Sequence, residues 1–161
     1  HRGYGKTFYE NDSGRNDFVV AKVARHTENL YFYVETAEPI TEPIGDGWMM
    51  LLMDVDRDKS TGWEGYDFAV NRTKPDGNET TLERSGHEWK WSQVSQVVFR
   101  VEGSQMELCI PRALLGLPLS GPLDFEFKWT DNVPASGDIM DFYVYGDVAP
   151  SGRFNYHYHA P

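Results

Sequence analysis

Large apolar residues alternate with charged ones along the stretch 123–129, which has the sequence Leu-Asp-Phe-Glu-Phe-Lys-Trp. Strict alternation places every second side chain on one face of an extended strand, so that one face is buried and the other is solvated. Less regular stretches of β-branched and aromatic residues give the same signal. They span residues 17–25, 30–36, 66–71, 80–84, 87–91, 97–101, 105–110 and 139–145. The pattern predicts about nine strands.

The stretch 48–53, Trp-Met-Met-Leu-Leu-Met, is apolar at every position. A strand buried on both faces has this composition, so we expect 48–53 to lie in the middle of a sheet. The segment 111–116 is the one helical turn that the sequence predicts, because Pro opens it and Gly closes it. Turn residues separate the strands at intervals of about 8–12 residues. These signals predict an all-β protein, an antiparallel β-sandwich of the jelly-roll or immunoglobulin-like kind with one short helix, folded as a single domain over residues 1–161.

The charge balance narrows the range of partners. The 161 residues include 25 acidic residues and 15 Lys or Arg residues, for a formal net charge of −10. Nucleic acid and anionic membrane surfaces require clustered basic residues, so neither is an expected partner. No apolar stretch approaches the roughly 20 residues of a membrane-spanning helix, so membrane insertion is not expected either. Cations and neutral ligands remain, and Cys109, the one cysteine, is expected to be a buried apolar residue.

Acidic residues are densest in the segment 54–67, directly after the stretch 48–53. Asp54, Asp56 and Asp58 have the one-three-five spacing with which a tight loop places carboxylates around a hard cation. Ser60 supplies an oxygen at position seven, and Asp67 follows a turn back toward Asp54. Calcium prefers such oxygen ligands. The segment therefore predicts a structural calcium site formed by these five residues.

The predicted calcium loop differs from an EF-hand. Lys59 occupies the sixth position, where an EF-hand needs Gly, and Gly65 occupies the twelfth, where it needs Glu. The flanking segments are also predicted strands rather than helices. The alternative interpretation is a solvated acidic turn, in which Arg57 and Lys59 offset the repulsion between the carboxylates. The sequence leaves these two interpretations open.

Trp63 and Tyr66 lie in the same segment among glycines, where an aromatic side chain either packs back onto the fold or meets a ligand. For Trp63 we expect the ligand. Sugar rings stack on aromatic faces, and planar polar side chains reach their hydroxyl groups. The further candidate ligand-binding residues are Asn71, Arg72, Trp129, Asn132, Arg153 and Tyr156. For Arg72 and Arg153, pairing with surplus carboxylates is an equal alternative. Trp129 also lies in a strand pattern that favours burial.

Catalytic residues are not expected. A retaining glycosidase places two carboxylates about 5–5.5 Å apart, and the 25 acidic residues offer many pairs without singling one out. The sequence contains no Gly-x-Ser-x-Gly elbow, no His-Glu-x-x-His and no phosphate-binding loop. His157 and His159 alternate with tyrosines near the C-terminus, where we expect solvated histidines rather than metal ligands. We therefore expect a protein that is not an enzyme.

Several of these segments together resemble the family 9 carbohydrate-binding modules, and more closely the family 9-like (DOMON-like) domains of bacterial polysaccharide-degrading proteins. The matching stretches follow one another over nearly the whole chain. They are residues 14–17, 30–34, 48–56, 61–68, 70–72, 110–112, 127–132, 138–143 and 146–150. Each stretch is short, so the resemblance depends on their number and order.

The resemblance implies an antiparallel β-sandwich that holds the end of a glycan between two Trp rings and carries structural calcium. It assigns Asn71 and Arg72 as polar contacts and Trp63 as one wall of the clamp. The second wall falls on one of three later aromatic residues, Tyr145, Phe154 or Tyr156. It further implies a monomeric module, extracellular or periplasmic, that binds an oligosaccharide or polysaccharide. Such a module is expected to be the C-terminal part of a larger glycan-degrading protein.

Other functions stay open at this point. One is a structural cap domain without any ligand, and another is hydrolase or lyase activity of the domain itself. A third is haem b binding, as in DOMON-type electron-transfer domains, with Met and His or Lys as axial ligands. The candidate axial methionines are Met49, Met50, Met53 and Met140. Met in an apolar strand is more often a core residue.

Overall fold

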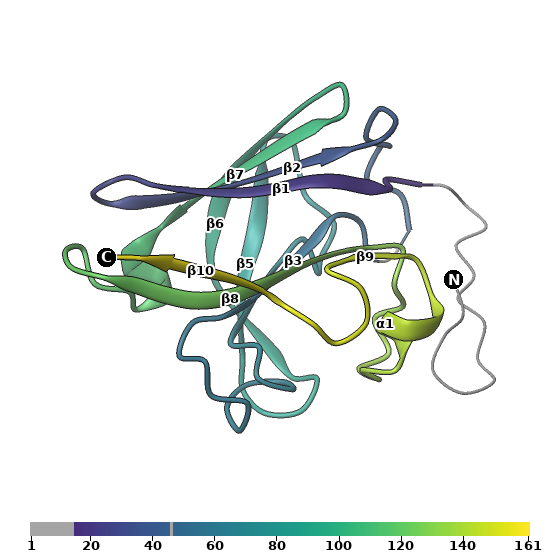
Figure 1. Cartoon of the computed structure of the whole chain (residues 1–161). Coiled ribbons are helices and arrows are strands. Elements are labelled where there is room, and N and C mark those ends of the chain that lie inside the picture. The colour runs from purple at the N-terminus through teal and green to yellow at the C-terminus, as the bar shows by residue number, and fades with distance from the viewer. Residues whose placement is uncertain (1–14, 46) are drawn as a thin grey trace.

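The computed structural model describes residues 15–45 and 47–161. Strands dominate the fold, and their pairings are antiparallel (Figure 1). The strands are β1 (Phe18–Arg25), β2 (Asn29–Thr36), β3 (Met50–Asp54), β4 (Phe68–Val70), β5 (Glu79–Ser85), β6 (Trp91–Glu102), β7 (Gln105–Pro111), β8 (Leu123–Asp131), β9 (Asp147–Ala149) and β10 (Tyr156–Ala160). The described residues also form a short 3-10 helix, η1 (Arg112–Leu115), and one turn of α-helix, α1 (Asp141–Val144). The all-β class predicted from the sequence is confirmed.

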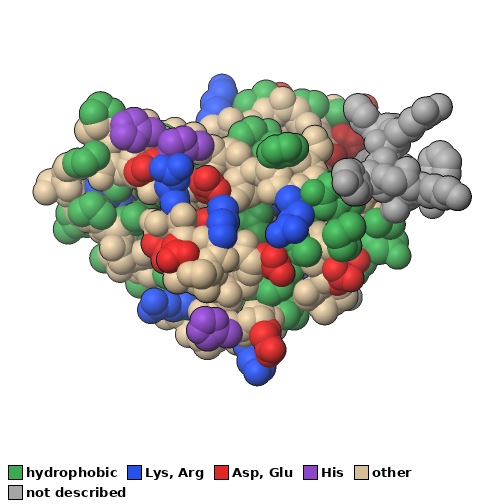
Figure 2. All heavy atoms as spheres, turned by 60° about the horizontal axis from the view of Figure 1, so that its bottom comes forward, with side chains coloured by type: hydrophobic (Ala, Val, Ile, Leu, Met, Phe, Trp, Pro, Cys, Tyr) green, Lys and Arg blue, Asp and Glu red, His purple; other side chains and the backbone are tan. Residues whose placement is uncertain are grey.

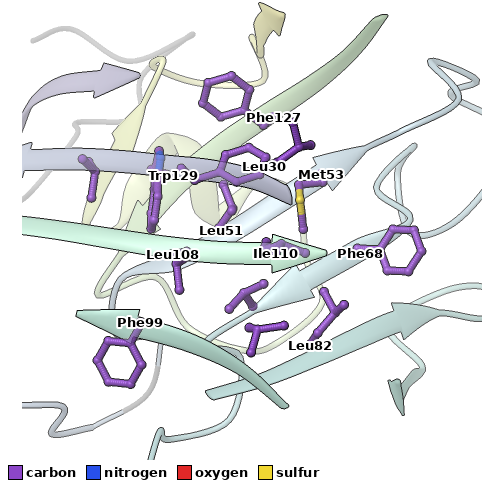
Figure 3. Close-up of a cluster of buried hydrophobic side chains, with 14 of the residues drawn as sticks. Leu30, Leu51, Met53, Phe68, Leu82, Phe99, Leu108, Ile110, Phe127 and Trp129 are labelled. Atoms are coloured by element: carbon purple, nitrogen blue, oxygen red, sulfur yellow. The ribbon is translucent and has the colours of Figure 1, made fainter. Parts of the chain in front are cut away.

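Hydrogen bonds join the strands into one continuous sheet. The strand order is β1-β2-β7-β6-β5-β4-β3-β8-β10, and β9 pairs with β8. The sheet bends, so that β1, β2 and β7 lie opposite β8 and β10 (Figure 1). Aromatic rings fill the space inside the bend: the ring centroid of Phe32 on β2 lies 5.9 Å from that of Phe125 and 5.5 Å from that of Phe127 on β8. The main hydrophobic core therefore lies between the two halves of the sheet (Figure 3).

Alternation along the strands positions this core. In β2, Leu30, Phe32 and Val34 are fully buried, while the residues between them are half-buried. In β8, Phe125 and Phe127 are buried, whereas the acidic residues beside them are exposed or half-buried. Full burial of a Leu, Val or Phe side chain contributes about 1.5–3 kcal/mol relative to its exposure. The alternation of apolar and polar residues predicted for 30–36 and 123–129 therefore matches the alternation of buried and more exposed side chains in β2 and in the first part of β8.

β3 is buried on both faces, as its apolar sequence predicts. Leu51 and Met53 belong to the main core, whereas Met50 and Leu52 belong to a second hydrophobic cluster on the opposite face. The other buried members of this second cluster are Trp63, Tyr66, Ala69, Val133, Phe142 and Val148. Several of them come from the loop that follows β3 and from the segment around α1. The loop after β3 is thus held against the outer face of the sheet.

Two strand predictions are wrong. Residues 139–145, predicted as a final core strand, form a turn and α1. The Asp138 carboxylate accepts a hydrogen bond from Met140 N at 2.9 Å, and local bonds of this kind favour a turn over a strand. In 87–91, only the last residue lies in a strand, because Glu88 has a φ of 57° and turns the chain.

The helical turn predicted at 111–116 is present as η1. Gly116 closes it in the left-handed region with a φ of 69°, which glycine adopts at little cost. Neither η1 nor α1, the helices of the described residues, is long and apolar enough to cross a membrane.

Candidate functional sites

The acidic segment leaves the sheet at the end of β3 and returns to it just before β4. Trp63 N donates to Tyr66 O at 2.9 Å, which forms a tight turn. Gly62 has a φ of 59° in this turn, and a Cβ there would overlap the Tyr66 carbonyl oxygen. Asp67 N then donates to Met53 O at 2.8 Å. This closure brings Asp67 next to the end of β3, where the acidic residues begin.

Three of the five predicted metal ligands come together. Carboxylate oxygens of Asp54, Asp56 and Asp67 all lie within 4.8 Å of one another. Burial raises the pKa of the Asp54 and Asp67 carboxyls above the ordinary value, so a nearby cation would stabilise their ionised forms. Asp58 and Ser60 lie outside this cluster, since Asp58 Oδ1 accepts hydrogen bonds from Ser60 N at 2.9 Å and from Ser60 Oγ at 2.6 Å. Asp58 and Ser60, the two predicted ligands outside the cluster, therefore pair with each other.

A lysine of the same loop contacts part of the acidic cluster. Lys59 Nζ lies 2.6 Å from Asp54 Oδ2 and 2.6 Å from Glu126 Oε2 on β8. No Lys or Arg in the described part of the chain forms an ion pair with Asp56 or Asp67. Carboxylate oxygens are the ligands that Ca²⁺ takes in proteins. The donor set of this cluster fits calcium, and Lys59 offsets only the charge at Asp54.

A groove lies beside Trp48, where the loop before β3, the connection from β4 to β5 and strand β6 meet. It consists of two hollows that share Pro43 and Trp48, and we call it the Trp48 groove. The larger hollow, of about 520 Å³, is lined by Ile40, Thr41, Glu42, Pro43, Trp48, Pro75, Gly77, Asn78, Phe99, Arg100 and Val101. The smaller, of about 290 Å³, is lined by Pro43, Gly45, Gly47, Trp48, Asn71, Arg72, Thr73 and Lys74. Of the eight predicted ligand-binding residues, Asn71 and Arg72 line this groove.

The position of Trp48 is fixed by its neighbours. Its side chain is 4% exposed, its Nε1 donates to Thr41 O at 2.8 Å, and its ring meets Phe99 edge-on at 6.1 Å between centroids. Asn78 and Arg100 are exposed at the rim of the larger hollow. The groove is therefore preformed, with an apolar base and hydrogen-bonding side chains at its rim, as small-ligand sites generally are.

The side chains of Asn71 and Arg72 are both engaged within the protein. Asn71 is buried, its Nδ2 donates to Met49 O at 2.8 Å, and its Oδ1 accepts from Thr80 Oγ1 at 2.5 Å. Arg72 donates two hydrogen bonds to the Glu83 carboxylate, of 2.7 and 2.6 Å. Asn71 therefore shapes the wall of the groove, and the carboxylate pairing that was one alternative for Arg72 is present.

The prediction that Trp63 faces a ligand is wrong. Its side chain is 4% exposed and lies in the second hydrophobic cluster, with its ring centroid 4.4 Å from that of Trp89 and 5.8 Å from that of Phe142. Tyr66 is buried in the same cluster, and its hydroxyl donates to Asn155 Oδ1 at 2.6 Å. The tight turn folds both rings back onto the sheet, because the outer face of β3 is apolar and must be covered.

The other predicted ligand-binding residues are spread over the molecule. Trp129 is fully buried in the main core, and Arg153 pairs with Glu64 at 3.1 Å. Asn132 is exposed where it follows β8, and Tyr156 is 36% exposed on β10. None of these four predicted residues lines the Trp48 groove. The predicted ligand-binding residues therefore do not form one site.

The residues considered for haem give that function no support. Met49, Met50 and Met53 are at most 2% exposed and lie within the two hydrophobic clusters, whereas Met140 is 47% exposed. The histidines in the described part of the chain are all exposed. Cys109, expected to be buried, is a half-buried free thiol on β7.

Most residues of the Trp48 groove are not predicted from the sequence. Trp48, Asn78 and Arg100 come from three segments that are distant in the chain. The signal that could have indicated the groove is the irregular segment 37–47, rich in Pro and Gly, directly before Trp48. Loops of that kind frequently carry binding residues on a rigid sheet.

Lys128 is a buried cation beside the second hydrophobic cluster. Its side chain on β8 is fully buried, and its Nζ donates to Phe154 O at 2.7 Å and to Pro150 O. The same Nζ lies 5.7 Å from the centroid of the Phe142 ring. Burial lowers the pKa of Lys128 to about 7, because the charged form loses its hydration.

We expect Lys128 to make the free energy of unfolding rise with pH above neutrality. Its pKa is about 7 in the folded protein, against an ordinary value of 10.5, so the unfolded chain binds more protons between these two values. One such group contributes at most about 1.4 kcal/mol per pH unit in that range, and nothing below it. Urea denaturation of the wild type and of Lys128→Met over this pH range measures the contribution. Equal slopes for the two proteins would contradict it.

Comparison of the chain with protein-family models, with curated proteins and with solved structures found no significant match. The two candidate sites, the Trp48 groove and the cluster of Asp54, Asp56 and Asp67, are therefore interpreted from their own geometry.

Proposed function

We propose that the protein is a non-catalytic carbohydrate-binding module, which holds an oligosaccharide in the Trp48 groove and calcium at Asp54, Asp56 and Asp67. The observation that carries the proposal is the preformed groove with its apolar base and polar rim. Its larger hollow, of about 520 Å³, falls within the range of about 300–1,000 Å³ found for small-ligand sites. We propose further that the module is extracellular or periplasmic and belongs to a glycan-degrading protein.

The lining of the groove suits a sugar. Ile40 and Pro43 are half-buried and Val101 is 36% exposed, so these lining residues offer apolar surface to the C–H faces of a sugar ring above the buried Trp48. Asn78 and Arg100 offer donors to hydroxyl groups from the same rim. Hydrogen bonds to a guanidinium contribute about 1.5–3 kcal/mol each. Arg100 is therefore the side chain from which we expect the largest polar contribution to binding.

A single carboxylate lines the described part of the Trp48 groove. Glu42 is the one carboxylate among the described residues that line it. Hydrolysis of a glycosidic bond by the retaining or the inverting route uses two carboxyl groups. We therefore propose a binding role for the groove and assign it no catalytic residue.

Calorimetry against a panel of plant and bacterial oligosaccharides tests the proposed ligand. For a glycan that binds, we expect Arg100→Ala to weaken the affinity about tenfold or more, the equivalent of about 1.4 kcal/mol. Arg153→Ala is the matched control, because Arg153 is an exposed arginine of the predicted set that lies outside the groove. Binding that depends on Arg153 and not on Arg100 would show that the glycan does not bind in the Trp48 groove. If no glycan of the panel binds, the proposal of a carbohydrate-binding module is wrong and a structural cap domain is favoured.

Calcium is expected to raise the melting temperature of the protein. A ligand at 100 times its Kd stabilises the folded state by about 2.7 kcal/mol, which corresponds to roughly 5–10 °C for a chain of this length. We expect Asp67→Asn to abolish most of this increment and EDTA to reverse it. Asp58→Asn is the matched control, since Asp58 lies outside the carboxylate cluster. An equal calcium increment in both variants, or none in the wild type, would refute the site.

A further inference from the structure

Two histidines and an aspartate share one face of the strand pair β8 and β10. His157 and His159 lie two residues apart on β10, and the strands pair in the register His157↔Glu126 and His159↔Asp124. His157 Nε2 contacts Asp124 Oδ1 directly, and His159 Nδ1 lies 3.7 Å from the same oxygen. Two imidazole nitrogens therefore converge on one carboxylate oxygen.

This face of the strand pair is accessible to solvent. The side chains of His157, His159 and Asp124 are 47%, 61% and 42% exposed. Figure 2 shows a pair of histidine side chains next to acidic and basic side chains on this side of the molecule. The other face of β10 packs on the core, with the ring centroid of Tyr158 5.0 Å from that of Phe125. Core packing thus fixes the strand and leaves its outer face available.

We propose that His157, His159 and Asp124 bind a divalent transition-metal ion of the Zn²⁺ type. Zinc takes imidazole nitrogen and carboxylate oxygen as ligands, with bond lengths of about 2.0–2.2 Å. Ligand atoms of a tetrahedral site with such bonds are about 3.3 Å apart. The distance of 3.7 Å from His159 Nδ1 to Asp124 Oδ1 is close to that value. The two imidazole nitrogens are more than 4.8 Å apart, so the His157 and His159 rings must rotate toward the ion to bind it, and water fills the fourth position.

Arg57 orients the aspartate from its other side. Arg57 Nη1 donates to Asp124 Oδ2 at 2.7 Å, which leaves Oδ1 directed at the histidines. Hydrogen bonds of this kind to ligating groups fix their orientation in metal sites.

The histidine site differs in ligand chemistry from the cluster of Asp54, Asp56 and Asp67. That cluster offers carboxylate oxygens alone, which suit calcium, whereas imidazole nitrogens suit zinc and its neighbours in the transition series. Arg57 lies between the two, because its backbone N also donates to Asp54 Oδ1 at 2.6 Å. Zinc binding is therefore best measured with calcium present in excess, so that the carboxylate cluster does not compete for zinc.

Titration calorimetry of the protein with ZnCl₂ in saturating Ca²⁺ tests the proposal. We expect Zn²⁺ to bind the wild type, and His157→Ala and His159→Ala each to weaken the affinity at least tenfold. The matched control is His87→Ala, which removes an exposed histidine from the turn before β6 and is expected to leave the affinity unchanged. No Zn²⁺ binding by the wild type, or equal affinity in the wild type and in both β10 variants, would overturn the proposal.

Thermal melting provides a second readout and shows that the variants are folded. In EDTA, the three histidine variants are expected to melt close to the wild type, because these side chains are exposed. Zn²⁺ is expected to raise the melting temperature of the wild type and of His87→Ala, since the ion links β10 to β8. The rise should be absent in His157→Ala, and the same rise in that variant would contradict the assignment.

Discussion

Replacement of Asp131 by Ala is expected to lower the free energy of unfolding by about 3–5 kcal/mol. The Asp131 side chain is fully buried at the end of β8. It accepts hydrogen bonds from Arg15 Nε at 2.7 Å, from Asn16 Nδ2 at 3.1 Å and from Met49 N at 2.9 Å. Removal of the carboxylate leaves these three donors without an acceptor. An unsatisfied buried donor costs about 1–3 kcal/mol of unfolding free energy. The segment before β1 and the residue before β3 would both lose their hydrogen bonds to β8.

Urea denaturation followed by Trp fluorescence measures this loss. Asp131→Asn keeps the shape of the side chain and one acceptor oxygen, so its loss is expected to be smaller than that of the Ala variant. Asp76→Ala, in the exposed turn before β5, is the surface control and is expected to stay within about 0.5 kcal/mol of the wild type. A loss below about 1 kcal/mol for Asp131→Ala would mean that the three donors find other acceptors.

Trp63→Ala is expected to cost about 3–5 kcal/mol of unfolding free energy. The ring is 4% exposed and packs against Trp89 and Phe142, with centroid distances of 4.4 and 5.8 Å. Its removal leaves a cavity over β3 that the tight turn of the loop cannot close, because Trp63 and Tyr66 also pair their backbones. Chemical denaturation measures the change.

The milder variant Trp63→Phe separates packing from ligand binding. It keeps an aromatic ring in the second hydrophobic cluster and is expected to remain folded, with a smaller loss of stability than Trp63→Ala. Affinity for any glycan that binds the Trp48 groove is expected to stay as in the wild type, because Trp63 does not line that groove. Loss of glycan affinity in folded Trp63→Phe, with little loss of stability, would restore the ligand role that the sequence suggests.

Much of the fold could be predicted because the burial of a strand determines its pattern of apolar and polar residues. β2 and β8 alternate since each has one face on the core, and β3 is uniformly apolar since both of its faces are covered. The segment 139–145 has the composition of a strand, yet the Asp138 carboxylate caps a turn there. Local hydrogen bonds from an Asp side chain compete with strand pairing, and at this segment they favour the turn.

The candidate sites were harder to predict because they depend on contacts between distant residues. The spacing of Asp54 and Asp56 could be seen in the sequence, and so could the return of Asp67, but the pairing of Asp58 with Ser60 depends on the local turn. Trp63 lies among glycines, which usually marks an exposed loop, and only the apolar outer face of β3 explains why it is buried. The Trp48 groove joins segments that have no common motif.

The second hydrophobic cluster limits how this protein can be engineered. Loop 55–67 supplies Trp63 and Tyr66 to the cover of β3, so it is part of the folded core and a poor position for grafting a foreign sequence. The loop between η1 and β8, by contrast, has an exposed Gly121 with nothing near its Cβ position, and Gly121 does not line the Trp48 groove. Display of a peptide, or attachment of a second domain, is better placed at that loop.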